Sequence, residues 1–162
     1  MTAANLASTA PPASSYNVFP TRGDEVTRSH LEQLSCLLMN GLQDRNWNDP
    51  VFIHLAPNLY AIWDGFPVCN SREQYLDNID ATMRASPNFC SEILLTSSTI
   101  RGVSKRKATV WITVRLGGLP LIGSEGLERE AVFRHDWRRR TEGWQCVQIT
   151  ALRGSSPIAR GC

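Results

Sequence analysis

The sequence predicts one α+β domain, in which a cone-shaped, curved antiparallel sheet and three helices from the N-terminal half enclose a pocket. The first half of the chain carries apolar residues at helical spacing. The second half carries four long runs rich in branched and aromatic residues, at about 90–103, 108–116, 127–140 and 144–153. Helices followed by strands indicate an α+β order, and the helices must then cover one face of the sheet. The length of 162 residues suits a single domain with its own core.

The first helix is predicted from residue 24 to about 46, because leucines at spacings of three and four share one face: Leu31, Leu34, Leu38 and Leu42. Asn48-Asp49-Pro50 begins a second, short helical segment that runs to about residue 55. A short strand follows at 59–63. Ser71 and Gln74 have the spacing of a capping box, so the third helix begins there, and Pro87 ends it.

The domain is expected to span residues 24–154, between an N-terminal arm at 1–23 and a C-terminal tail at 155–162. The arm is rich in Pro, Ser and Ala and shows no apolar periodicity, so we expect it to be flexible. No run of residues has the length and apolarity of a membrane span or of a secretory signal. The five cysteines include no C-x-x-C pair, which favours reduced thiols in a cytoplasmic protein.

The net charge of +2 is unevenly distributed along the chain. Residues 1–90 hold 5 Arg and 9 acidic residues, whereas residues 91–162 hold 12 Lys and Arg and 6 acidic residues. Arginine-rich sequences are typical of phosphate and nucleic-acid binding, but they also follow genome composition. Strand alternation distributes the arginines of 134–140 over two faces, so we expect no nucleic-acid partner and no membrane partner.

Three local sequences are informative when they are taken with the element order: Asn46–Asp49 with His54–Pro57, Ser71–Tyr75, and Val132–Arg139 with Gly143–Cys146. They resemble those of the nuclear transport factor 2-like superfamily. Within that superfamily the chain looks like the SnoaL-like polyketide cyclases and their fungal relatives, over about residues 24–154. The resemblance implies a cone fold with a pocket. The fold hosts dehydratases, isomerases, cyclases and non-catalytic binding proteins.

The catalytic residues of these families have no full counterpart here. The position of the Tyr-Asp pair of scytalone dehydratase falls near Leu42 and Gln43, and a pocket histidine falls on Ile112. The paired histidines of many SnoaL-like final strands correspond to Gln148 and Thr150. No catalytic set is therefore transferred as a whole.

The hairpin at 127–153 decides which side chains face the pocket. A type I turn with a bulge at Gly143 would place Arg140 opposite Trp144, and Arg134, Asp136, Gln148 and Thr150 on one face. We assign this polar face to the pocket, because the family resemblance implies a pocket residue near Arg134. The other face then carries Phe133, His135, Trp137, Val147 and Ile149. A shorter or longer turn would instead join His135 and Trp137 to Gln148.

Four residues are candidates for catalysis: Asp136, Arg134, Asp64 and His135. Asp136, between two arginines, suits a base or an acceptor for a substrate hydroxyl, and Arg134 suits a stabiliser of an enolate or carboxylate. The alternatives are a solvated outer face for this pair, an ordinary Asp-Gly turn for Asp64, and a packed strand residue for His135.

Six residues are candidates for substrate binding: Trp63, Tyr75, Met83, Trp111, Gln148 and Thr150. The aromatic residues and the methionine suit a flat apolar ligand, although core packing would also account for each. The three histidines are scattered, so we expect no metal site, and the sequence indicates no cofactor.

These residues predict a cofactor-independent cyclase, isomerase or dehydratase that acts on a polyketide- or terpenoid-like intermediate of specialised metabolism. The alternative is a non-catalytic ligand-binding or dimerisation module of the same fold. The expected partner is a small hydrophobic metabolite. Because Val147 and Ile149 are placed on the face away from the helices, we also expect a homodimer through the outer face of the sheet.

Overall fold

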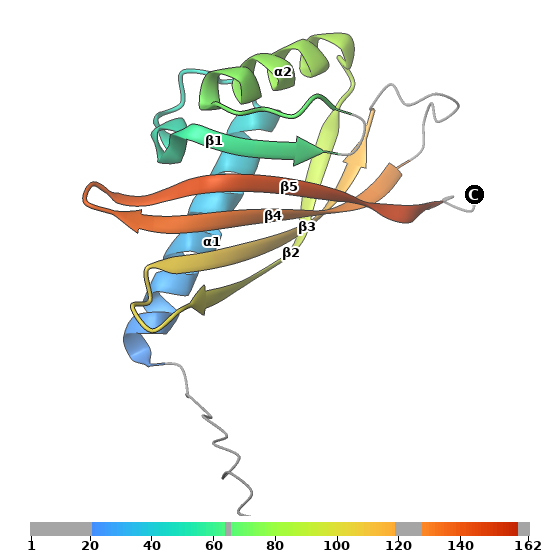
Figure 1. The fold of residues 1–162 in the computed structure, drawn as a ribbon. Coiled ribbons are helices and arrows are strands. Elements are labelled where there is room, and N and C mark those ends of the chain that lie inside the picture. Colours follow the sequence, from blue (N-terminus) through green and yellow to red (C-terminus); the bar gives the residue numbers. More distant parts are fainter. Residues whose placement is uncertain (1–20, 64–65, 119–127, 159–162) are drawn as a thin grey trace, which may run out of the picture.

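A five-stranded curved sheet forms the centre of the computed structural model, which describes residues 21–63, 66–118 and 128–158, the last six without their side chains. The strands lie in the order β1-β5-β4-β3-β2. Helix α1 crosses one face of the sheet, and α2 lies beside β1 (Figure 1). The bounds of the elements are α1 Arg22–Gln43, η1 Pro50–His54, β1 Leu55–Trp63, α2 Arg72–Ala85, β2 Cys90–Arg101, β3 Lys107–Gly117, β4 Glu128–Arg140 and β5 Gly143–Ile158.

The α+β class predicted from the sequence is confirmed, with one refinement of the sheet. Strands β2 to β5 pair antiparallel, as expected, but β1 pairs parallel to β5 and makes the sheet mixed. The second predicted helix is the short 3-10 helix η1. Strand β1 begins four residues earlier than predicted, at Leu55.

The helix ends follow local capping chemistry. Thr21 and Asp24 form a capping box at the start of α1. Ser71 caps α2 and accepts a hydrogen bond from the backbone N–H of Gln74 at 3.1 Å. Helix α2 ends at Ala85, two residues before Pro87, as the sequence predicts.

One face of the sheet packs against α1 and forms the core. The alternate residues of β4 that face α1 are buried, and Trp137 donates from its indole Nε1 to Ser35 Oγ of α1 at 3.1 Å. Val110 and Ile112 of β3 are fully buried in the same cluster. We call this the inner face. Neither of the two α-helices in the described ranges covers the opposite, outer face (Figure 1).

In the β4–β5 hairpin, the four polar residues share one face as predicted, but the turn and the position of the bulge differ from the prediction. Arg140 pairs with Gly143, not with Trp144, and the bulge lies further along, where Asp136 pairs with Gln148 and Trp137 with Cys146. A two-residue turn alone would place the residues of β5 on the opposite faces from those predicted. The extra residue at this bulge shifts the pairing by one and restores the predicted faces beyond the bulge. Arg134, Asp136, Gln148 and Thr150 therefore share one face, as predicted.

Two elements extend beyond the expected domain span of 24–154. Helix α1 begins at Arg22, and most of the expected arm, residues 1–20, lies outside the described residues. Strand β5 continues past residue 154 to Ile158, because Glu128 and Arg129 of β4 pair with Ile158 and Pro157. No helix in the described ranges is long and apolar enough to cross a membrane.

Candidate functional site

An apolar pocket lies between the helices and the inner face of the sheet. It holds about 660 Å³ of space, its open mouth included. Its walls include Met39 and Leu42 of α1, Trp63 at the end of β1, Met83 of α2 and Phe133 of β4. No charged side chain lines it among the residues that the structure describes. Such a wall favours an apolar ligand.

A second, smaller hollow adjoins the pocket. Trp63 and Phe66 border both spaces, and Tyr75 and Asn78 of α2 line only the smaller one. The Trp63 ring meets Tyr75 and Phe133 edge to face, with ring centroids 6.0 Å and 5.4 Å apart. Trp63 therefore stands at the boundary of the two spaces, in contact with aromatic rings on both sides.

Two hydrogen-bond donors at this boundary are buried without a partner. Neither the Tyr75 hydroxyl nor the Trp63 indole Nε1 has an acceptor within the described part of the chain. Burial raises the pKa of Tyr75 well above its usual value, so the phenol stays protonated at neutral pH. An indole N–H is a donor only. Buried polar groups normally have partners, so this pair lacks an acceptor that a ligand would supply.

His135 lies deeper in the same face, as the next inward residue of β4 after Phe133. It is 1% exposed, and neither of its buried ring nitrogens has a hydrogen-bond partner among the described residues. Val110 and Ile149 pair with it on the neighbouring strands. Burial lowers the pKa of His135 to about 4, so the imidazole is neutral at pH 7 and one nitrogen is a free acceptor.

The structure brings only some of the predicted site residues together. Trp63 and Met83 line the pocket, Tyr75 lines the adjoining hollow, and His135 is buried on the same inner face. Asp64 lies outside the described residues.

The expectation that the polar face of the hairpin lines the pocket is wrong. Phe133, His135 and Trp137 face α1, so the alternate residues of β4 and their neighbours lie on the outer face. This correction applies to five predicted residues: Arg134, Asp136, Trp111, Gln148 and Thr150. The physical reason is that a large apolar face gains more from burial under a helix than a charged one does.

The outer-face residues nevertheless form the network that the sequence suggests. Arg134 binds Asp136 through two contacts, Nη2 to Oδ2 at 2.7 Å and Nε to Oδ1 at 3.1 Å. Thr109 donates to Asp136 Oδ1 at 2.6 Å, and the Arg134 guanidinium lies 5.5 Å from the centre of the Trp111 ring. These contacts hold Arg134 in one position.

Sequence reasoning missed several pocket residues, including Phe66, Phe89, Leu116 and Ala131. Their apolar character gives no signal that separates a pocket wall from a packed core.

Within the described ranges, no three His, Cys, Asp or Glu side chains form a group that could hold a metal ion.

Comparison with known proteins identifies the fold. No protein-family model matches the chain, and no curated protein matches it in sequence. Among solved structures, it is similar to the hexachlorocyclohexane dehydrochlorinase LinA-type3 from Novosphingobium barchaimii LL02, with a TM-score of 0.69, 16% identity, and coverage of 84% of this chain and 92% of that one.

Two further structures share this fold. An NTF2-like protein of unknown function from Pseudomonas putida KT2440 has a TM-score of 0.64 and 16% identity, over 78% of this chain and 86% of that one. A putative ketosteroid isomerase from Shewanella frigidimarina has a TM-score of 0.58 and 15% identity, over 74% of this chain and 92% of that one. The chain thus has the NTF2-like, cystatin-like fold, and at these identities the likeness extends to the fold alone.

Proposed function

We propose that the protein is a cofactor-independent isomerase, cyclase or dehydratase that acts on a hydrophobic carbonyl compound of polyketide or terpenoid type. One observation carries this proposal: where the apolar pocket meets the smaller hollow, two buried donors, Tyr75 Oη and Trp63 Nε1, have no acceptor among the described residues. The proposal includes the SnoaL-like subtype within the NTF2-like fold.

The two donors suit a carbonyl oxygen that becomes an enolate. When a base removes a proton from the carbon next to the carbonyl, the electron pair moves onto the oxygen, where two hydrogen bonds stabilise the charge. Return of a proton to another carbon completes an isomerisation, loss of a neighbouring hydroxyl as water completes a dehydration, and attack on a second carbonyl closes a ring. All three reactions need the same site.

The proposed base is the neutral imidazole of His135, with Asp64 as the second candidate. His135 is the next inward residue of β4 after Phe133 and does not itself line the pocket, so the proposal includes a movement of the pocket wall that lets substrate reach it. The names of two structural neighbours, a dehydrochlorinase and a putative ketosteroid isomerase, are compatible with proton-transfer chemistry in this fold.

A non-catalytic binding protein is the second candidate function. It is favoured by the main pocket itself, whose described wall contains no carboxylate and no imidazole. Such a wall would hold an apolar metabolite without changing it.

Substitutions of two exposed leucines in the sheet test whether the ligand binds in this pocket. Leu152 is 57% exposed and lines the pocket, whereas Leu95 is 63% exposed and does not. We expect Leu152→Lys to weaken the binding of apolar carbonyl ligands at least about tenfold, because a charge next to the apolar mouth is costly. Leu95→Lys is the matched control and should leave binding unchanged.

The measurement is native mass spectrometry against a panel of cyclic hydroxyketones and unsaturated ketones, with product analysis of the same mixtures. Products that are isomerised or have lost water support the enzyme. Binding without any product supports the second candidate. If Leu95→Lys and Leu152→Lys weaken binding equally, the ligand does not use this pocket.

A homodimer in the cytoplasm through the outer face remains part of the proposal, but its basis changes. Ile149 is 1% exposed and belongs to the inner face, so it cannot contribute to such a contact. Exposed apolar residues of the outer face take its place: Tyr60 and Ile62 of β1 and Leu95 of β2. We expect sedimentation at micromolar concentration to give twice the chain mass, and a single-chain mass would contradict the dimer.

A further inference from the structure

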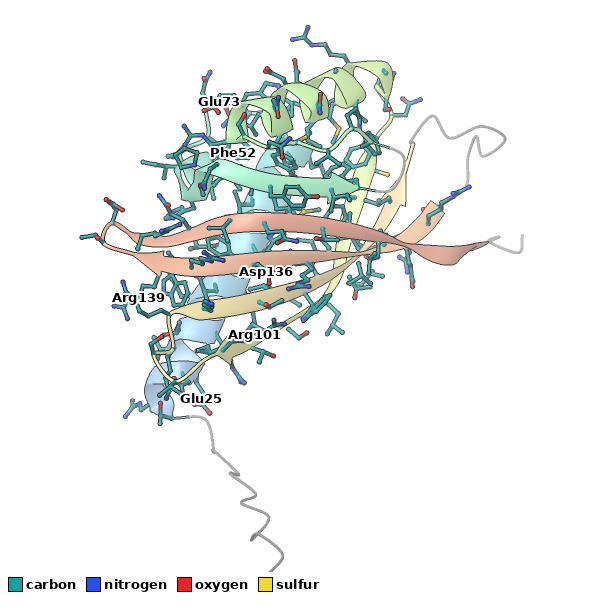
Figure 2. The ribbon with its side chains drawn as sticks, in the orientation of Figure 1. Glu25, Phe52, Glu73, Arg101, Asp136 and Arg139 are labelled. Atoms are coloured by element: carbon teal, nitrogen blue, oxygen red, sulfur yellow. The ribbon has the colours of Figure 1, made fainter. Side chains whose placement is uncertain are left out.

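Three cations form a row across the outer face at the end of the sheet opposite the pocket. Arg101 of β2 pairs with Lys107 of β3, and Lys107 pairs with Arg138 of β4. Residues paired in this way have Cβ atoms about 5 Å apart. All three residues line one open groove, together with Asp136 and Gln148. Arg101 and Asp136 are labelled in Figure 2.

The positive charge of this row is not balanced within the described residues. Arg101, Lys107 and Arg138 make no ion pair there, whereas Lys105 is bound to Asp24 and Arg115 to Glu92. The groove contains one carboxylate, Asp136, and Arg134 and Thr109 already occupy both of its oxygens. Like charges on directly paired strand positions destabilise a sheet, so the row carries a cost that no neighbouring group offsets.

The groove matches a phosphate-bearing anion in its chemistry. It holds about 540 Å³, its open side included. Two guanidinium groups and an ammonium group suit phosphate oxygens, which carry close to two negative charges per monoester at neutral pH. Gln148 lies at the edge of the same groove and offers an amide to a neighbouring polar group of the ligand.

We infer that this groove, which we call the cation groove, binds a phosphate- or diphosphate-bearing small molecule. The inference does not rest on the proposed function, because the pocket lies on the other face of the sheet. Among the exposed apolar residues of the outer face, Leu95 lies six residues before Arg101 on β2, whereas Tyr60 of β1 pairs with Gln148 at the edge of the groove.

Isothermal titration with inorganic diphosphate and with inorganic phosphate tests the inference at low ionic strength. We expect one site per chain, tighter binding of diphosphate than of phosphate, and weaker binding as salt is added. Lys107→Gln and Arg138→Gln should each weaken diphosphate binding about tenfold or more. Arg139→Gln is the control, because Arg139 is an exposed arginine on the same strand that does not line the groove.

A thermal melt separates a binding role from a structural one. Without ligand, Lys107→Gln should raise the Tm at low salt, since it removes repulsion from the row, and it should lose the rise in Tm that diphosphate gives the wild type. A structural lysine would lower the Tm instead, and that result would count against the inference.

Vesicle-binding measurements show whether the phosphate belongs to a lipid headgroup or to a soluble molecule. Vesicles that contain a phosphoinositide and bind in a Lys107-dependent way indicate a lipid headgroup, and absence of vesicle binding indicates a soluble ester; both outcomes support a phosphate site. The inference is overturned if neither diphosphate nor phosphate binds saturably, or if Arg139→Gln weakens binding as much as Lys107→Gln. It is also overturned if a short RNA binds more tightly than diphosphate through the same residues, which would indicate a nucleic-acid surface.

Discussion

Lowering the pH from 7 to 4 is expected to reduce the free energy of unfolding by about 3 kcal/mol through His135 alone. The pKa of His135 is about 4 in the folded protein, because burial disfavours the charged imidazole. In the unfolded chain the pKa returns to about 6.5. As the pH falls between these values, the unfolded chain takes up a proton that the folded protein does not. Stability is therefore greatest above pH 6.5 and is lost as the pH falls towards 4.

Denaturant unfolding at several pH values measures this effect by difference. His135→Leu should be less sensitive to pH than the wild type by about 3 kcal/mol over the same interval. At pH 7 it should be as stable or more stable, because it removes two unpartnered buried nitrogens. His30→Gln is the control, since His30 is exposed on α1 and should not change the curve. Equal losses for the wild type and His135→Leu would mean that His135 is not buried in its neutral form.

Much of the fold could be predicted from the sequence, because its signals are local. The leucine spacing of α1 and the capping residue Ser71 of α2 are fixed by neighbours a few residues away. The strands after residue 90 also follow from composition and alternation. The parallel pairing of β1 with β5 joins segments far apart in the sequence, so no local pattern reports it.

The candidate site was harder to predict, and the reason lies in the hairpin. Alternation correctly separated Arg134 and Asp136 from Phe133 and Trp137, but it does not say which set faces the helices. The family resemblance favoured the polar set, whereas burial energy favours the apolar set, and in the structure burial decides. Trp137 and Phe133 were the signal that should have identified the inner face, because large aromatic side chains gain most from burial.

Tyr75→Phe is expected to lower turnover of the carbonyl substrate roughly 10²–10³-fold, the usual cost of removing one donor to a developing oxyanion. The phenol O–H is the only group that this change removes, and the aromatic ring that packs against Trp63 stays in place. The effect should fall on kcat more than on KM, because the hydrogen bond strengthens as charge moves onto the oxygen. If the protein only binds its ligand, the same change should weaken binding about tenfold.

The stability of the same variant distinguishes a ligand donor from a structural tyrosine. Tyr75 Oη is buried and has no partner among the described residues, so its removal should leave the free energy of unfolding unchanged or raise it by about 1 kcal/mol. Tyr60→Phe is the matched control, since Tyr60 is 40% exposed on the outer face and should affect neither property. A Tyr75→Phe protein with full turnover and full affinity would remove Tyr75 from the site. A less stable one would mean that its hydroxyl has a partner inside the fold. A gain in stability together with a loss of function is the combination that only an unsatisfied ligand donor explains.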